Sequence, residues 1–267
     1  TSLPALGYVC GAELSVAFET ASAIPAATDM TEVTECAPLP KRHCCSSGAP
    51  APPVVEAEAP ALAEEHRLLL EDRVELPRLY LAWHSPRLYG AGDAELDLVA
   101  TTLSNGKASR LYRTLVHERR LATDVTVMQS SRELSGVFQI VATAAPGHPL
   151  AELDAVISDE LERIGRDGPS DDELERSVAQ VEAYFVYRLQ TVGGFGGKSD
   201  QLNGYNVVTG DPGHFEADLS RYRAASRAAL GEAVRRHLVQ SPRVAVSVVP
   251  SGGGSLALPG SAPAQVS

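Results

Sequence analysis

The sequence lacks the features that would place it in a membrane or on a nucleic acid. No apolar run approaches the roughly 18 residues needed to span a bilayer. Lys and Arg number 23 against 34 Asp and Glu, and the only basic cluster is His117–Arg120. The first basic residue is Lys41, so no charged segment precedes an apolar core and no secretory signal is predicted. A chain with a formal net charge of -11 is expected to bind neither nucleic acid nor an anionic membrane.

Cysteine is also scarce, and it is confined to one end of the chain. All four cysteines, Cys10, Cys36, Cys44 and Cys45, lie within the first 45 residues, and His43 adjoins two of them. A zinc cluster is one interpretation. However, adjacent cysteines cannot easily bind one tetrahedral ion, and paired C-x-x-C motifs are absent. A chain of 267 residues can also build a core without disulfides. Unpaired or adventitiously paired thiols are therefore the simpler interpretation of residues 10–45.

Residues 1–53 differ in composition from the rest of the chain. They are rich in Ala, Thr, Ser and Pro with little periodicity, and SSGAPAPP at 46–53 is typical of a linker. Our hypothesis is that this segment is disordered or not a native fold, arising from a truncation or a shifted reading frame. Proteolysis that left residues 1–50 intact would contradict it. We expect one domain over 54–250 and a flexible Gly/Ser/Pro-rich tail over 251–267.

The stretch 79–143 has the clearest pattern of secondary structure. LYLAWHS (79–85) predicts a strand, and DAELDLVATTLSNG (93–106) predicts a helix because its apolar residues recur at helical spacing. Asp93 is placed to cap the first turn of that helix, and Asn105-Gly106 to end it. A second short helix is expected over 108–122, followed by strands at 122–130 and 136–144.

Helices dominate the following hundred residues. One is predicted over 149–167, and Ser170 with Glu173 forms a capping box that starts another, which ends at GGFGG (193–197). Shorter helices are expected at 199–208, 213–225 and 226–239, before a last strand, RVAVSVVP. Strands at both ends and in the middle of the domain predict the α+β class: a single mostly antiparallel sheet with helices packed on one face.

The run SNGKASRLYRTLVHERRLA, set between LYLAWHSP and GGFGGKSDQLNGY, resembles the second, non-catalytic domain of the insulinase/pitrilysin family of zinc metallopeptidases. Mitochondrial processing peptidase and the core proteins of the respiratory bc1 complex share that fold. The resemblance covers roughly residues 54 to 250, and it implies the same α+β architecture.

The family's active domain binds zinc through H-x-x-E-H, two histidines on one helical face with a glutamate between them. None of the seven histidines here has a second histidine four residues away. The nearest match, Leu62-Ala-Glu-Glu65-His66, has leucine at the first ligand position. His66 is therefore interpreted as a solvated residue before a strand.

Many family members lend an arginine and a tyrosine from the non-catalytic half to the substrate. The matching positions here are Val116 and Thr123, which cannot supply those groups. Arg119 and Arg120 lie at the wrong helical phase. We therefore predict no catalytic, no cofactor-binding and no metal-binding residue in this chain.

Other candidate motifs have structural interpretations. GGFGGKS (193–199) nearly spells a phosphate loop, but Val192 stands at its first position and a helix precedes it instead of a strand, which favours a flexible helix stop. Asp171-Asp172 suits a helix N-terminus, and Glu64-Glu65 a solvated face. His84 beside Ser85 lacks the G-x-S-x-G setting of a nucleophile. Tyr184, Phe185 and Tyr187 suit the core and rim of one helix.

The resemblance implies a chamber-forming, non-catalytic domain of an insulinase/pitrilysin-like peptidase, inactive alone. It places zinc on a catalytic partner domain, either upstream or in a separate subunit, and peptide substrate in the assembled chamber. No cofactor is expected in this chain itself. The alternative is an assembly or scaffold protein without proteolytic activity, like the respiratory core subunits that keep this fold.

Overall fold

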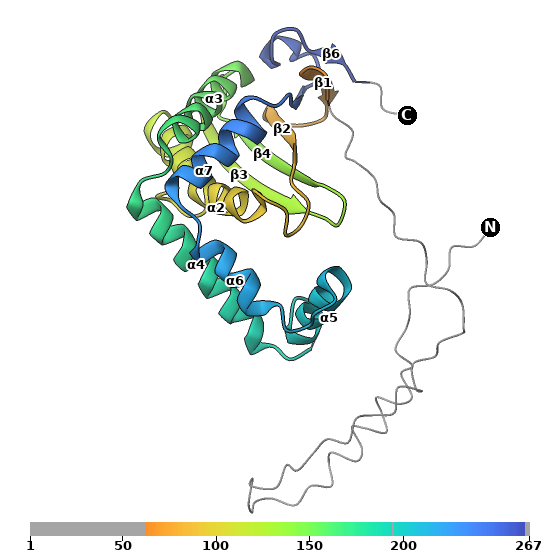
Figure 1. Ribbon diagram of the computed structural model, residues 1–267. Helices are drawn as coiled ribbons and strands as arrows, with labels where there is room; N and C mark the ends of the chain where they lie inside the picture. Colours follow the sequence, from red (N-terminus) through yellow and green to blue (C-terminus); the bar gives the residue numbers. More distant parts are fainter. Residues whose placement is uncertain (1–61, 194, 265–267) are drawn as a thin grey trace, which may run out of the picture. The chain divides into compact units, whose positions relative to one another are not determined.

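A six-stranded sheet organises the described part of this computed structural model, residues 62–193 and 195–264 (Figure 1). The predictions for residues 1–53, with their cysteines, and the boundary at residue 54 lie outside those residues. The elements are β1 (His66–Asp72), β2 (Arg78–Ser85), α2 (Asp93–Ser104), the π-helix η1 (Tyr112–Glu118), β3 (Ala122–Ser131), β4 (Gly136–Ala144), α3 (Leu150–Asp167), α4 (Asp171–Gln190), α5 (Lys198–Thr209), α6 (Phe215–Arg223), α7 (Arg227–Val234), the π-helix η2 (Arg235–Val239), β5 (Val244–Pro250), the 3-10 helix η3 (Gly254–Leu256) and β6 (Ala262–Pro263).

The strand order of the sheet is β3-β4-β2-β5-β1-β6. Three neighbouring pairs are antiparallel, namely β3 with β4, β4 with β2, and β2 with β5. The pairs of β1 with β5 and with β6 are parallel. The predicted α+β class with one mostly antiparallel sheet is thus confirmed, and the parallel pairs are confined to the β6 end.

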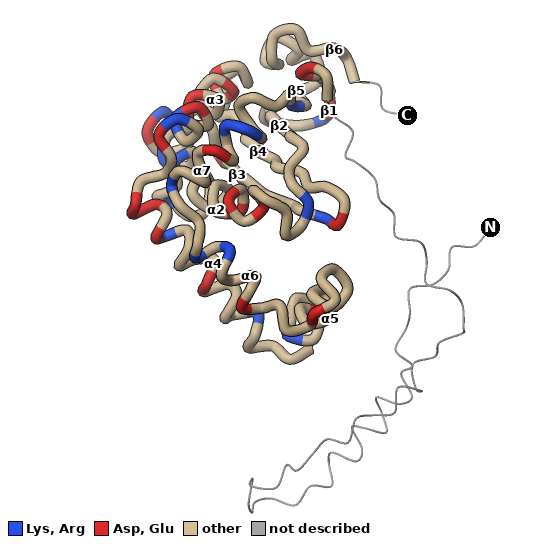
Figure 2. The backbone as a smooth tube through the Cα atoms, in the orientation of Figure 1, with Lys and Arg blue, Asp and Glu red and all other residues tan. Residues whose placement is uncertain are grey.

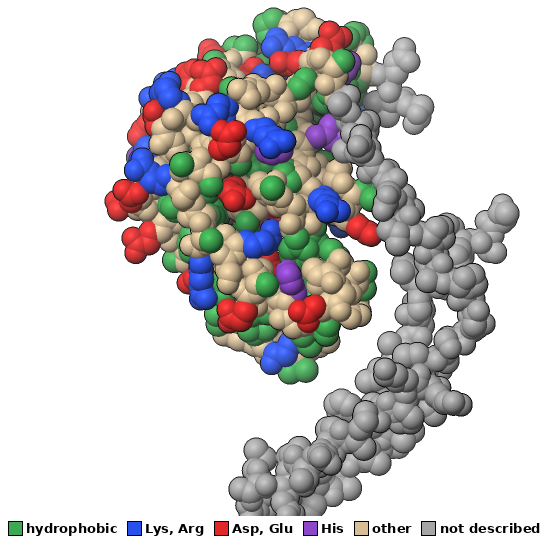
Figure 3. Space-filling model, in the orientation of Figure 1, with side chains coloured by type: hydrophobic (Ala, Val, Ile, Leu, Met, Phe, Trp, Pro, Cys, Tyr) green, Lys and Arg blue, Asp and Glu red, His purple; other side chains and the backbone are tan. Residues whose placement is uncertain are grey.

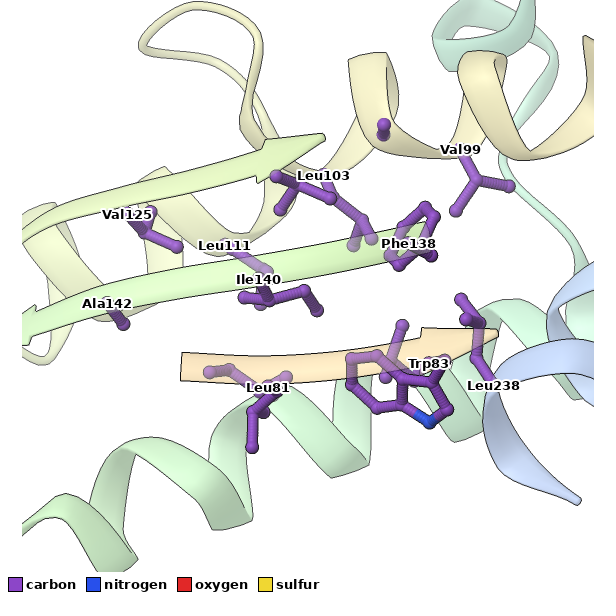
Figure 4. Close-up of a cluster of buried hydrophobic side chains, with 14 of the residues drawn as sticks. Leu81, Trp83, Val99, Leu103, Leu111, Val125, Phe138, Ile140, Ala142 and Leu238 are labelled. Atoms are coloured by element: carbon purple, nitrogen blue, oxygen red, sulfur yellow. The ribbon is translucent and has the colours of Figure 1, made fainter. Parts of the chain in front are cut away.

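The core lies between one face of the sheet and the helices α2, α3, α7 and η2, which cover that face (Figure 1). Because side chains alternate along a strand, every second residue of β2 is buried, including Leu81 at 0% and Trp83 at 2% exposure. They lie beside Ile140 and Phe138 of β4. Trp83 and Phe138 meet edge to face at 6.2 Å between ring centroids, and Figure 4 shows these side chains together with Leu103 of α2.

A largely buried ion pair joins the start of α4 to the segment before η1. Ser170 accepts the N–H of Glu173 at 3.2 Å, and Glu173 accepts the N–H of Ser170 at 2.8 Å, so the predicted capping box is present. Arg110 donates two hydrogen bonds to the same Glu173 carboxylate, at 2.8 and 2.6 Å. Burial alone would raise the pKa of Glu173, but the hydrogen bonds from Arg110 and Ser170 outweigh it and lower that pKa to about 2.

The start of α2 differs from the prediction. Asp93 was expected to cap the first turn, but the residue before the helix is Gly92, with φ of 93°, and no side chain caps the helix N–H groups. The carboxylate of Asp93 instead accepts the N–H of Tyr89 at 2.9 Å and the guanidinium of Arg221 at 3.1 Å. The long-range ion pair to α6 competes with the local cap, and it leaves Asp93 1% exposed.

The expected tail over 251–267 is packed against the domain as far as the structure describes it. Leu258 is 3% exposed, and its N–H is bonded to the hydroxyl of the buried Ser247 at 3.1 Å. Residues 262–263 form β6 beside β1, and the N–H of Ala264 is bonded to the carbonyl of Leu69 at 2.7 Å. The Gly/Ser/Pro composition concealed this strand because only two residues pair.

Both edges of the sheet are partly occupied. The parallel strand β6 covers β1 at one edge. At the other edge, the hydroxyl of Ser104 lies against the backbone of β3, accepting the N–H of Val127 at 2.9 Å and donating to its carbonyl at 3.4 Å. The end of α2 thus fills a hydrogen-bonding position in the middle of the edge strand.

Charged side chains of both signs are interspersed over the helices, whereas α5 carries few (Figure 2). No helix among the described residues is long and apolar enough to cross a membrane.

Candidate functional site

A cavity of about 870 Å³ lies between α2, α4, α5 and α6, with β3 along one side. Its walls combine apolar side chains, such as Val181 and Phe185 of α4, with carboxylates, tyrosines and amides. The volume falls within the range of roughly 300–1,000 Å³ that is usual for ligand sites. The cavity is therefore the natural place to look for a functional site in the described domain.

A network of carboxylates and tyrosines forms the wall of the cavity at α2 and α6. Tyr222 donates its hydroxyl to Asp97 at 2.7 Å, and Tyr205 donates to Asp218 at 2.8 Å. Arg221 donates to Asp218 at 2.6 and 3.1 Å and also to Asp93. The guanidinium of Arg221 is thus shared between two carboxylates, and Asp97 is in neither pair.

Asp97 is the carboxylate of this network without a cation. Its hydrogen bond among the described residues comes from the neutral phenol of Tyr222. Burial is the main cause that raises the pKa of Asp97 to about 7; the nearby charge of Asp93 acts in the same direction, while Tyr222 and Arg221 oppose it. Asp97 can therefore gain or lose a proton near neutral pH.

Two glutamine side chains in the cavity wall leave hydrogen-bonding capacity unused. Gln201 of α5 is 6% exposed, and its Nε2 donates to Tyr205 at 3.2 Å, but its Oε1 has no partner among the described residues. Gln129 of β3 lines the same cavity, and neither of its amide atoms is paired there. Buried amides are usually satisfied, so these two side chains leave hydrogen-bonding capacity in the cavity wall for water or a ligand.

The end of the domain formed by α4 and α5 exposes an unusual number of large apolar side chains, visible around α5 in Figure 3. Tyr184 and Tyr187 of α4 are 58% and 67% exposed. The others are Val186, Val192, Phe195, Leu202, Val207 and Val208. Tyr184 and Val208 also line the cavity, so the exposed apolar surface continues into it.

The positions predicted to match the family's substrate-binding arginine and tyrosine lie away from this cavity. Val116 of η1 packs against the core, and the hydroxyl of Thr123 in β3 donates to the carbonyl of Thr143 at 3.3 Å. Arg119 and Arg120 are exposed where η1 ends, and Arg120 has φ of 55°. None of the four lines the cavity.

The GGFGGKS stretch connects α4 to α5. The N–H groups of Lys198 and Ser199 are bonded to the carbonyls of Thr191 and Val192, at 2.8 and 3.0 Å. The N–H of Gly196 is bonded to Asp200 at 3.0 Å. Backbone donors that a phosphate loop would direct at a phosphate are thus used within the connection, as the helix-stop interpretation requires.

The remaining candidates also have structural roles. His66 is exposed in β1, and His84 and Ser85 are consecutive residues of the regular strand β2. Phe185 is 8% exposed and packs edge to face against Tyr222 at 5.5 Å, so the core-and-rim interpretation of α4 holds.

No group of three or more His, Cys, Asp or Glu side chains within 62–193 and 195–264 is placed to hold a metal ion. The carboxylates of the cavity network are held by tyrosines and an arginine.

Sequence reasoning missed the cavity network. Its members come from α2, α5 and α6, and two of them, Asp97 and Tyr222, are 125 residues apart in the sequence. The one local signal is the spacing of Asp218, Arg221 and Tyr222 on a single helix face.

Comparisons with known proteins agree on the family. The profile described as "Peptidase M16 inactive domain" matches residues 27–181, starting before the boundary predicted at 54. An uncharacterized zinc protease of Streptomyces coelicolor is 29% identical over 98 residues, which are 37% of this chain and 21% of that protein. This chain therefore spans about a fifth of that relative's length.

Solved structures share the fold. A protease from Helicobacter pylori has a TM-score of 0.66 at 20% identity, over 76% of this chain and 48% of that one. A peptidase M16 inactive domain from Pseudomonas fluorescens has a TM-score of 0.62 at 18% identity, over 74% and 47%. A chain of complex III from Candida albicans has a TM-score of 0.59 at 16% identity, over 70% and 46%.

Proposed function

Because this chain belongs to the peptidase M16 inactive-domain family, we propose that it forms the non-catalytic wall of a peptidase whose zinc-bearing domain lies elsewhere. The partner would be an H-x-x-E-H domain of the same family, upstream or in a separate subunit, and the substrate a peptide enclosed between the two. We retain residues 54–250 as this domain and residues 1–53 as a separate segment, although the family profile begins inside that segment, at residue 27.

The observation that carries the proposal is the match to the inactive-domain profile over residues 27–181. The sequence supports it, since none of the seven histidines has a second histidine four residues away. The chain also spans about half of the Helicobacter pylori and Pseudomonas fluorescens chains, which leaves length in those proteins for a second domain.

The test begins with the purified, dialysed chain alone. We expect close to zero zinc by elemental analysis and no cleavage of a quenched fluorescent peptide. About one zinc per chain with chelator-sensitive cleavage would overturn the proposal, because the active site would then lie in this chain.

Reconstitution supplies the second part of the test. An H-x-x-E-H polypeptide of the same family, from the same source as this chain, is mixed with it, and cleavage of the same peptide is followed. We expect the mixture to cleave it much faster than either chain, and the same mixture with the partner's motif glutamate changed to glutamine to be inactive. A partner whose activity is unchanged by this chain would contradict the proposal.

A scaffold role is the second candidate. It is favoured by the similarity to a chain of complex III, although at 16% identity that similarity concerns the fold. A stable complex between this chain and a neighbouring gene product that lacks H-x-x-E-H, with no peptide cleavage, would select this candidate over the peptidase wall.

A further inference from the structure

We propose that the cavity between α2, α4, α5 and α6 binds a polypeptide segment by seating an arginine side chain against Asp97. This inference deepens the proposed function, on which it rests for the peptide being a substrate, by naming a chemical class of peptide. Its test needs this chain alone and no catalysis. Its failure is therefore distinguishable from failure of the reconstitution.

The first argument is the charge balance in the cavity wall. The carboxylates that line it belong to Asp97, Asp200 and Asp218, and the cations to Arg188 and Arg221. Arg221 is bound by Asp218 and Asp93, and the Nε of Arg188 donates to the carbonyl of Gly196 at 3.0 Å. The guanidinium of Arg188 also lies 5.7 Å from the ring centroid of Tyr184, and neither arginine is paired with Asp97. No ion pair in the described part of the chain includes Asp97, so a bound cation would neutralise the ionised Asp97 carboxylate.

The second, independent argument is the supply of unused acceptors. The Oε1 of Gln201 has no partner among the described residues, both the Oε1 and the Nε2 of Gln129 are unpaired there, and both side chains line the cavity. A guanidinium carries five N–H donors and no acceptor, whereas a second carboxylate or a phosphate would bring only acceptors. The group that suits Asp97 and these amide oxygens together is therefore a multiple donor with positive charge.

Aromatic rings in the wall favour arginine over a compact ammonium. Tyr184, Tyr205 and Tyr222 line the cavity, and planar guanidinium groups stack on such rings. The domain already shows this contact at two of these rings, because Arg188 lies 5.7 Å from the ring centroid of Tyr184 and Arg221 lies 5.4 Å from that of Tyr222. Tyr205 is therefore the one of the three with no arginine against its ring among the described residues.

The size and surroundings of the cavity indicate a peptide instead of a free amine. A volume of about 870 Å³ exceeds what one side chain fills, and Tyr184 and Val208 extend the wall outwards as exposed apolar surface. Apolar residues on either side of an arginine would cover that surface. The ligand class is therefore an unfolded segment with an arginine between apolar residues.

Calorimetric titration of the whole chain with acetyl-Leu-Arg-Leu-amide tests the proposal. The matched control is the same peptide with citrulline, which has nearly the shape of arginine and no charge. We expect the arginine peptide to bind at least tenfold more tightly at pH 8. Equal affinities, or no binding of either peptide, would overturn the proposal. Arginine amide binding as tightly as the tripeptide would refute the polypeptide part.

Asp97→Asn places the charge recognition on one residue. We expect this variant to lose the preference for arginine over citrulline, and Asp124→Asn, which changes an exposed carboxylate of β3, to keep it. A preference that survives in Asp97→Asn would refute the assignment to Asp97. Urea denaturation of both variants checks that each is folded.

The pH dependence of the unmodified chain keeps the test informative if Asp97→Asn does not fold. With the pKa of Asp97 at about 7, its ionised fraction rises about tenfold between pH 6 and pH 8, so affinity for the arginine peptide should rise by a similar factor. An affinity for the arginine peptide that stays constant over this range would contradict the proposal. The charged and titratable groups around Asp97 are Asp93 on its own helix, Asp218, Arg221 and Tyr222 on α6, Arg188 on α4, Asp200 and Tyr205 on α5, and Tyr89 and His214 in the flanking loops.

His214 is an ionisable side chain in contact with the rings of Tyr89 and Tyr205, so its part in the effect is tested separately. Two comparisons separate the two residues. His214→Gln should keep the rise in affinity, and the citrulline peptide should show none. Loss of the rise in His214→Gln would transfer the effect to His214 and overturn the role of Asp97.

Discussion

Removing the charge of Glu173 should destabilise the domain by an amount that depends on pH. The variant is Glu173→Gln, which keeps a side chain able to complete the capping box with Ser170. It removes the negative charge that receives two hydrogen bonds from Arg110, at 2.8 and 2.6 Å. Both side chains are largely buried, at 14% and 16% exposure, so solvent screens the pair little.

The magnitude follows from the pKa of Glu173, which falls from 4.5 to about 2 on folding. At roughly 1.4 kcal/mol for each pKa unit, the ionised carboxylate contributes about 3 kcal/mol above pH 5. Because the folded-state pKa is depressed, this stability is present above the unfolded pKa of 4.5 and is lost as the pH falls towards 2. At pH 3 the same two pKa values leave about 1.4 kcal/mol of this stabilisation.

Urea denaturation at pH 7 and pH 3 measures the effect as the difference between the unmodified chain and Glu173→Gln. The matched control is Asp172→Asn, an exposed carboxylate in the same first turn, which should cost less than about 1 kcal/mol at either pH. If Glu173→Gln costs under about 1 kcal/mol at pH 7, or costs the same at both values, the ion pair does not hold α4 as described.

Three further changes probe other parts of the domain. Leu81→Ala removes a side chain with 0% exposure from the middle of β2. It should lower the free energy of unfolding, measured by urea denaturation, by about 2–5 kcal/mol. An effect below about 1 kcal/mol would mean that the core closes around the gap. Asp97→Asn should raise the free energy of unfolding by up to about 4 kcal/mol at pH 8 and by little at pH 4. The pKa of Asp97 rises from 3.8 to about 7 on folding, so the unmodified chain loses stability as the pH rises through that window. Equal effects of the substitution at the two pH values would contradict this. Gly136→Ala would place a Cβ 2.5 Å from Ser85 Oγ and 2.6 Å from the carbonyl of Pro86. This substitution should lower the stability measured by thermal unfolding by about 1–3 kcal/mol. The control Gly204→Ala, which has open space around it, should not destabilise the domain.

Most elements of the fold could be predicted because their signals are local. The alternation in LYLAWHS placed β2, and the capping box of Ser170 and Glu173 placed the start of α4. The Asp93 cap was wrong because a distant partner, Arg221, takes the carboxylate, and no local pattern reports such competition. The strand β6 escaped prediction for a related reason, since its pairing depends on β1, nearly 200 residues earlier.

The cavity could not be predicted from local pattern at all. Asp97 occupies an ordinary helical position in the sequence, and only the packing of α6 against α2 brings Tyr222 to 2.7 Å from it. The expectation of no catalytic residue rested on a missing motif. The absence of a catalytic motif cannot predict a binding wall built from tyrosines, amides and carboxylates on separate helices.

The occupied sheet edges limit how this domain can assemble with another protein. A chain that added a strand beside β1 would have to displace β6, and one that added a strand beside β3 would have to replace the hydroxyl of Ser104 at Val127. Strand addition directly beside β1, or across Val127 of β3, is therefore hindered, and so is edge-to-edge association at these positions. A partner that docks elsewhere on the domain would recognise side chains, so the specificity of assembly there depends on residue identity more than on backbone pairing.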